Sequence, residues 1–297
     1  MIGSRLLPGV LLAAGLLVGP AATAGQPAAP SAALVPEDDG FEIENAFGFG
    51  QGAGIAQKGE WEVGTTLSGR FGKRRGSYRA LGTETEAEYG ITDRIQAGFA
   101  AFTSSHRIRG VPGLDNRSAF GFDGFAVGGK AVILERDVDG PIGFSVATEL
   151  EWHRYDETEG ARGRTFGNET AAILEASLVP NLLYVAANAG FEIERGRARG
   201  EKAETESSLF TSAALAWRFQ PRMTLGAEAR LEHAFEGVLG RHEGSALFLG
   251  PTFYAKVSNK VTISAAFGTQ VWGSGPGRLN LDAFERHRAM VRVGVEF

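Results

Sequence analysis

The last nine residues constrain the fold of this chain more than any other stretch. Apolar and other side chains alternate here, as Ala289, Val291, Val293, Val295 and Phe297 against Met290, Arg292, Gly294 and Glu296. Successive side chains of a β-strand point to opposite faces, so this pattern predicts a strand with one wholly apolar face. A soluble β-sandwich also contains such strands. An apolar face that ends on an aromatic residue favours a strand that contacts lipid.

The same alternation recurs from Glu60 onward in about twelve segments of ~10 residues, the length that crosses a bilayer at a tilt of about 45°. Between them, short turns at 90–94, 179–181, 220–222 and 258–260 alternate with longer charged loops at 104–118, 154–164, 194–206, 234–244 and 273–282. An even-stranded barrel with both termini in the periplasm has this rhythm.

An open strand edge cannot face lipid, so the first and last strands must pair. We therefore predict an all-β fold, a transmembrane antiparallel β-barrel of about 12 strands over residues 60–297, closed by the C-terminal strand that ends in Phe297. In the segment 165–178 the pattern does not decide which side chains face outward, because Ile173 competes with Leu174 for the outer face.

The start of the chain has the pattern of a secretory signal peptide over residues 1–24. Arg5 precedes an apolar run, 6–18, and Ala22-Thr23-Ala24 forms a small-residue cleavage site. No later stretch approaches the ~20 apolar residues of a membrane-spanning helix. These features predict export to the outer membrane of a Gram-negative bacterium.

Residues 25–59 are predicted to form a periplasmic N-terminal segment. The segment is rich in Ala and Pro, then acidic, and then contains a glycine-aromatic run at 47–52. The part from Phe41 to Lys58 has neither helical nor strand periodicity. Its pattern leaves two possibilities open, a plug inside the barrel or a collar or linker.

The charge balance and the absence of cysteine exclude several functions. The chain has 30 Lys and Arg against 35 Asp and Glu, a net charge of −5, which does not favour nucleic acid as a partner. Without cysteine there is no disulfide, thiolate metal site or cysteine-linked lipid anchor. No motif predicts a metal or a cofactor.

Charged residues at the predicted inward positions are candidates to line the lumen. They are Arg70, Glu84, Glu86, Glu88, Lys130, Glu149, Glu151, Glu192, Arg218, Glu228, Arg230, Glu232, Lys256, Arg288 and Arg292. Buried charges need partners or water. Two interpretations stay open: the charges select solutes in a narrow pore, or they pair with one another and hold the barrel in shape.

The sequence does not favour an enzyme. It contains no Gly-x-Ser-x-Gly and no His-Glu-x-x-His motif. The histidines His106, His153, His233, His242 and His287 fall in or near predicted loops and strand ends, which indicates solvated or interfacial side chains. None has a serine on the same face that would predict a nucleophile pair, so no catalytic residue is assigned.

Several segments resemble a family of outer-membrane transporters associated with meta-pathway phenol degradation. They are 57–62 (QKGEWE), 86–94 (EAEYGITDR), 127–130 (VGGK) and 249–252 (LGPT). The segments 47–49 and 107–115 look more like an uncharacterised proteobacterial branch of such barrels. The resemblance implies uptake of small compounds, with aromatic compounds as one class. The terminal strand also resembles that of bacterial outer-membrane barrels, which implies that Phe297 is an assembly signal read by the barrel assembly machinery.

These observations together predict a narrow passive channel or uptake porin for small solutes, with outer-membrane lipid as the surrounding partner. The first alternative is a closed structural or adhesive barrel without a pore. A lipid-modifying enzyme, with Ser and His on the outer wall, is a distant second alternative.

Overall fold

The computed structural model describes residues 43–297 apart from 137–140 and 199–201. The predicted signal peptide and residues 25–42 of the N-terminal segment lie outside these residues. The strands are β1 (Trp61–Phe71), β2 (Ser77–Thr92), β3 (Ile95–Arg109), β4 (Arg117–Leu134), β5 (Ile142–Tyr155), β6 (Arg162–Val179), β7 (Leu183–Ala198), β8 (Glu204–Gln220), β9 (Met223–Glu236), β10 (Arg241–Lys256), β11 (Val261–Gly273) and β12 (His287–Glu296). A short 3₁₀ helix, η1 (Pro276–Arg278), precedes β12.

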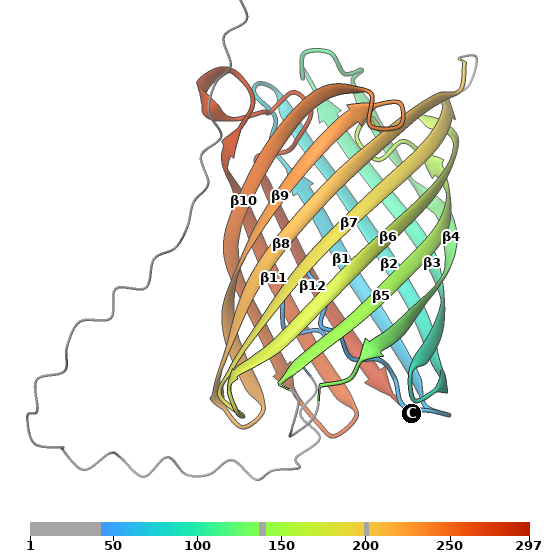
Figure 1. Cartoon of the computed structure of the whole chain (residues 1–297). Coiled ribbons are helices and arrows are strands. Elements are labelled where there is room, and N and C mark those ends of the chain that lie inside the picture. The colour runs from blue at the N-terminus through green and yellow to red at the C-terminus, as the bar shows by residue number, and fades with distance from the viewer. Residues whose placement is uncertain (1–42, 137–140, 199–201) are drawn as a thin grey trace, which may run out of the picture. The chain divides into compact units, whose positions relative to one another are not determined.

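The strands form one closed antiparallel barrel in chain order (Figure 1). The barrel closes between β1 and β12, where Val63 lies opposite Val295 and Leu67 opposite Val291. The backbone N–H of Phe297 donates to the carbonyl oxygen of Trp61 at 2.9 Å. Closure gives every strand two neighbours, so no backbone edge is left for lipid to desolvate. The predicted barrel and its closure by the C-terminal strand are confirmed.

The outer face of the wall carries an exposed apolar belt, the surface that a bilayer would cover. Leu67, Phe99 and Leu150 are all more than half exposed. In β6 the ambiguity is resolved, because Leu174 is 45% exposed and Ile173 only 1%. Ile173 therefore faces inward.

Among the described residues, no helix has the length and apolar character needed to cross a membrane.

The strands extend further than the apolar alternation predicts. The loop expected at 104–118 is reduced to 110–116, because β3 continues to Arg109 and β4 begins at Arg117. The loops expected at 154–164 and 234–244 shrink to 156–161 and 237–240 for the same reason. Backbone pairing continues past the apolar belt, where the outer face meets water and need not be apolar. The periodicity ends there although the strand does not.

The two ends of the barrel differ. The C-terminus lies at the end with the short turns 180–182, 221–222 and 257–260 (Figure 1). At the opposite end the loop 274–286 folds against the inner wall, where the amide of Gln270 donates to the carbonyl oxygens of Asn280 at 3.1 Å and Glu285 at 3.2 Å. We call these the turn end and the loop end.

Lys73, in the loop between β1 and β2, connects this loop to the loop 274–286 at the loop end. Its ammonium group donates to the carbonyl oxygens of residues 282 and 283, at 3.2 and 3.1 Å. Burial lowers the pKa of Lys73 to about 8, and the nearby carboxylate of Glu285 opposes this shift.

Candidate functional site

Residues 43–58 lie inside the barrel, near the turn end (Figure 1). Phe47 is fully buried and packs with Tyr184 of β7, Ala216 of β8 and Tyr254 of β10. These side chains come from strands on one side of the wall and face the lumen. We call residues 43–58 the inner segment.

Side chains of the wall bind the backbone of the inner segment along its length. The amide N–H groups of Phe49, Gln51, Ala53 and Ala56 donate to Glu228 Oε2 at 2.8 Å, Asn188 Oδ1 at 2.7 Å, Glu175 Oε2 at 3.0 Å and Gln96 Oε1 at 2.7 Å. Asn188 returns a bond to the carbonyl oxygen of Gln51 at 3.0 Å. The four wall residues belong to β9, β7, β6 and β3, so the segment is held from several directions across the lumen.

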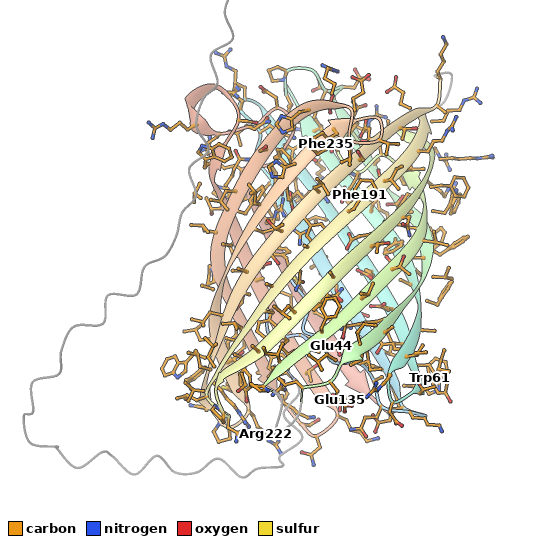
Figure 2. The ribbon with its side chains drawn as sticks, in the orientation of Figure 1. Glu44, Trp61, Glu135, Phe191, Arg222 and Phe235 are labelled. Atoms are coloured by element: carbon orange, nitrogen blue, oxygen red, sulfur yellow. The ribbon has the colours of Figure 1, made fainter. Side chains whose placement is uncertain are left out.

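An ion pair adds to this attachment. Lys130 on β4 is 5% exposed, and its ammonium group contacts the carboxylate of Glu44 and donates to the carbonyl oxygen of Gly52 at 2.8 Å. Figure 2 shows Glu44 in the half of the barrel nearer the turn end. Removing either charge would leave the other without its charged partner inside the barrel.

The glycines of the inner segment allow its close approach to the wall. Gly48 has φ of +83°, and a Cβ there would lie 2.5 Å from Thr252 Cγ2 and 2.7 Å from Glu228 Oε2. A Cβ at Gly52 would lie 2.6 Å from Glu175 Oε2. Only glycine fits these positions without a shift of the wall. The glycine-aromatic run therefore corresponds to a segment with small residues against the wall and Phe47 in an apolar pocket.

All fifteen predicted lumen candidates lie on the wall face opposite the exposed apolar side chains, and the structure brings several of them together. Arg292 on β12 lies 3.4 Å from Glu62 and from Glu88, and 3.8 Å from Glu86. Lys256 lies 3.6 Å from Glu296. Glu62 was not among the candidates.

A second network lies on the same strand β12 but nearer the loop end, and reaches β9. Arg288 forms a bidentate pair with Glu232, at 2.6 and 2.8 Å, and also contacts Glu285 at 2.7 Å. Arg230 lies 2.6 Å from the same Glu232. Arg288 also stacks over the ring of Phe248, 3.6 Å from its centre. In this network lumen charges pair with one another, as the second of the two open interpretations expects, whereas the first network includes residues that face the lumen near the inner segment.

The remaining candidates are placed differently. Arg70 pairs with Glu157 in the loop after β5, whereas Arg218 donates to the carbonyl oxygen of Pro221 at the turn end. Lys130 and Glu228 bind the inner segment. Glu84, Glu149, Glu151 and Glu192 lie on the acidic side of the lumen, on β2, β5 and β7.

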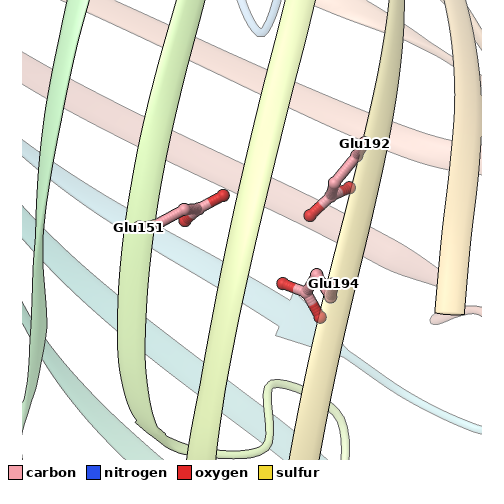
Figure 3. A group of neighbouring side chains, drawn as sticks. All are labelled: Glu151, Glu192 and Glu194. Atoms are coloured by element: carbon pink, nitrogen blue, oxygen red, sulfur yellow. The ribbon is translucent and has the colours of Figure 1, made fainter. Parts of the chain in front are cut away.

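A cavity of about 230 Å³ lies in the lumen towards the loop end. Carboxylates dominate its lining: Glu84, Asp123, Glu151, Asp156, Glu157, Glu192 and Glu194. His153 also lines the cavity, between Asp123 at 3.4 Å and Glu151 at 2.8 Å. The cavity is therefore a chamber of the lumen with a mainly acidic lining, of which Figure 3 shows Glu151, Glu192 and Glu194, and we call it the acidic cavity.

The prediction for two of the histidines is wrong. His106 and His153 were placed in solvated loops or at interfaces, yet both line the acidic cavity, and His106 is 3% exposed. His106 falls in the part of β3 that extends past the apolar alternation, whereas His153 lies within the predicted strand, next to the outward Trp152. His106 Nε2 lies 2.9 Å from the carbonyl oxygen of Glu157, to which it must donate.

The prediction concerned nucleophile pairs on the outward apolar face, and one buried serine does contact two histidines. Ser245 on β10 lies opposite His233 on β9, and its Oγ is 2.8 Å from His233 Nδ1 and 2.9 Å from His242 Nε2. Ser245 is only 4% exposed, so its hydroxyl is closed to a lipid ester. Within the described part of the chain, neither imidazole has a carboxylate to orient it. The arrangement is not that of a serine hydrolase.

Sequence reasoning did not identify Glu44 and Gln96 as residues that hold the inner segment, and it did not connect the inward Asn188 and Glu175 with that segment. Gln96 and Asn188 are polar residues at inward positions, a signal that a search restricted to charged residues overlooks. Glu44 lies in a segment without periodicity, and nothing in the sequence indicates its pairing with Lys130.

Solved structures share the barrel fold at low sequence identity. The COG4313 outer membrane channel from Pseudomonas putida F1 superposes with a TM-score of 0.54 and 9% identity, over 82% of this chain and 98% of that chain. The β domain of the Bordetella autotransporter BrkA gives 0.53 and 17%, over 82% of this chain and all of that chain. At these identities the likeness extends to the fold alone.

No curated protein matches the chain in sequence. One family model matches residues 40–297, which include the inner segment and the whole barrel. The chain belongs to the DUF6662 family, a family of unknown function.

Proposed function

We propose that this protein is an outer-membrane channel or uptake porin for small solutes, with a preference for cations, and that the inner segment closes its turn end at rest. The observation that supports this proposal most directly is the acidic cavity above the seated inner segment. A solute that enters from the loop end would meet a carboxylate-lined chamber before it reaches the inner segment.

The charge of the cavity favours cations. Among the described residues, no Lys or Arg lies within ion-pair distance of Glu84, Glu149, Glu192 or Glu194. Carboxylates outnumber the basic side chains of the lining, Arg70 and His153, and a concave site with an excess of one sign of charge concentrates the opposite sign. The resemblance to phenol-degradation transporters would instead imply small aromatic solutes, and the acidic lining does not favour a neutral aromatic ligand.

Export through a cleaved signal peptide and location in the outer membrane are part of the proposal. The exposed apolar belt and the orientation of the turn end, on which both the C-terminus and the inner segment lie, are compatible with it. Uptake would then run from the loop end to the turn end.

A closed barrel without a pore is the second candidate. The observation in its favour is the number of bonds that hold the inner segment, from four strands and one buried ion pair. In that case the lumen charges would serve stability alone.

Conductance of the refolded protein in a planar bilayer under a KCl gradient tests the proposal. We expect a small conductance with a cation-selective reversal potential. Replacement of Glu84, Glu149 and Glu194 by Gln should move the reversal potential towards zero, because it removes fixed negative charge from the pore. An anion-selective pore would contradict the proposed preference, and the absence of conductance, also after the inner segment is removed, would favour the closed barrel.

Deletion of Phe297 is expected to impair assembly into the outer membrane. Phe297 completes the apolar face of the closing strand, is 66% exposed and bonds to Trp61 at the closure. The folded fraction in isolated outer membranes, measured by heat-modifiable migration on a gel, should fall severalfold. Lys260→Ala, in a turn at the same end of the barrel, serves as the control and should leave the folded fraction unchanged. Normal insertion without Phe297 would refute its role as an assembly signal.

A further inference from the structure

The outward face of the barrel wall becomes basic at the loop end. Ile108 is fully buried on the inner side of β3, so its two neighbours, Arg107 and Arg109, point outward and are exposed. On β6, the exposed Arg164 shares the outward face with Phe166, which is 63% exposed. With equivalent positions on β2 and β7, six residues form a group that we call the arginine arc: Arg79, Arg107, Arg109, Arg162, Arg164 and Arg195.

The positive charge of the arc is not balanced within the wall. Arg79 on β2 lies directly opposite Arg107 on β3, and Arg164 on β6 lies directly opposite Arg197 on β7. Like charges in opposite positions of neighbouring strands destabilise a sheet. The outward positions of these four strands contain no Asp or Glu, and among the described residues no carboxylate lies within ion-pair distance of the arc. An anion from outside the chain would relieve this repulsion.

The arc lies where the apolar belt ends. Leu178, at the turn end of β6, is 57% exposed and belongs to the belt. From Leu178 to Arg164 the strand rises by about 33 Å along the barrel axis, at ~3.3 Å per residue and a tilt of about 45°. The hydrocarbon core of a bilayer is about 30 Å thick, so the arginines reach the level of the lipid head groups. Directly below them, Phe120 is 78% exposed and Phe166 63%.

The arc is confined to one end and one side of the barrel. At the turn end, outward strand positions carry exposed apolar side chains such as Trp61 and Trp217. Around the rest of the loop end, the described strands β1, β8, β9, β11 and β12 have no Lys or Arg on the outward face. Arg241, at the start of β10, is paired with Glu236 and Glu243. A general attraction to anionic lipid would not require this one-sided arrangement, which indicates a particular partner.

We propose that the arginine arc binds a lipid that carries at least two phosphate groups on a large head group, a phosphorylated glycolipid of the leaflet at the loop end. Guanidinium groups bind phosphate oxygens in a fixed, bidentate geometry. The two halves of the arc, on β2–β3 and β6–β7, are separated by three strand spacings, about 14 Å, which exceeds the size of a single phosphate group. The acyl chains would lie on the exposed rings of Phe120 and Phe166.

This inference rests on the proposed location in the outer membrane and not on conduction. The arc lies on the outside of the wall, so its variants should leave the conductance and its reversal potential unchanged. A silent barrel that binds the lipid would keep this site and refute the channel. A conducting barrel that does not bind the lipid would do the reverse.

Native mass spectrometry of the refolded full-length protein in neutral detergent, with bisphosphorylated lipid A as the probe, tests the proposal. We expect saturable binding to the unmodified protein. The triple variant Arg79→Gln, Arg107→Gln and Arg109→Gln should bind roughly tenfold or more weakly, because each basic side chain near an anionic lipid surface adds to affinity. The triple variant Arg162→Gln, Arg164→Gln and Arg195→Gln, at the other half of the arc, should show the same loss. Without lipid, both should be at least as stable to heat as the unmodified protein, since like charges are removed.

The matched control removes three positive charges from exposed turns at the turn end, as Arg94→Gln, Arg222→Gln and Lys260→Gln. Its affinity for the lipid should equal that of the unmodified protein. Dephosphorylated lipid A should bind roughly tenfold or more weakly, because it lacks the charge that the arginines recognise. Sodium phosphate should not displace the lipid, because it offers nothing to the apolar belt below the arc. Absence of saturable binding, an equal loss in the control, equal binding of the dephosphorylated lipid, or displacement by phosphate would each overturn the proposal.

Discussion

Replacing Gly48 by valine is expected to release the inner segment and convert a weakly conducting barrel into a steadily conducting one. The new Cβ would lie 2.5 Å from Thr252 Cγ2 and 2.7 Å from Glu228 Oε2. Gly48 also has φ of +83°, which a β-branched residue adopts only under strain. Backbone strain and overpacking each cost about 1–3 kcal/mol, so the seated state should lose about 2–6 kcal/mol relative to the released one.

Gly54→Val provides the matched control within the same segment. A Cβ at Gly54 would meet nothing closer than 3.8 Å, and its φ lies outside the left-handed region, so conductance should stay at the level of the unmodified protein. A protein that lacks residues 25–58 gives the upper limit of conductance. If Gly48→Val and this deletion are both silent although the barrels are folded, the inner segment does not close a pore, and the closed-barrel alternative is favoured.

Arg288→Met should destabilise the barrel more than any other single charge removal in the network of β9 and β12. The change leaves Glu232 and Glu285 buried without their main partner, and it removes the cation from the ring of Phe248. Breaking a buried pair by removing one partner costs about 3–5 kcal/mol. Urea unfolding in lipid vesicles, followed by tryptophan fluorescence, measures the loss.

Arg241→Met is the control for this experiment. Arg241 also pairs with two carboxylates, Glu236 and Glu243, but its side chain is 72% exposed at the loop end. Exposed pairs contribute little, so no measurable change in stability is expected. If Arg288→Met is as mild as Arg241→Met, water in the lumen already solvates the network, and its charges are free to act on solutes.

The alternation of side chains determined the barrel, the number of its strands and the inward position of its charges. Lipid contact requires one apolar face on every strand, and this requirement leaves a period of two in the sequence. Lipid contact also allows no open strand edge, so the first and last strands must pair. Where the outer face meets water the demand disappears, so the extended end of β3, with His106, could not be predicted.

Only the tertiary structure decided which of the inward groups meet. The inner segment has no periodicity, since its backbone is bound by side chains such as Asn188 and Glu228, far away in the sequence. The convergence of Glu151 and Glu194 depends on the register that places both opposite Gly167. The two-residue period in the sequence indicates which face of the wall a residue occupies. The position of the residue along the barrel axis, and therefore its partners across the lumen, is set by strand register and barrel closure.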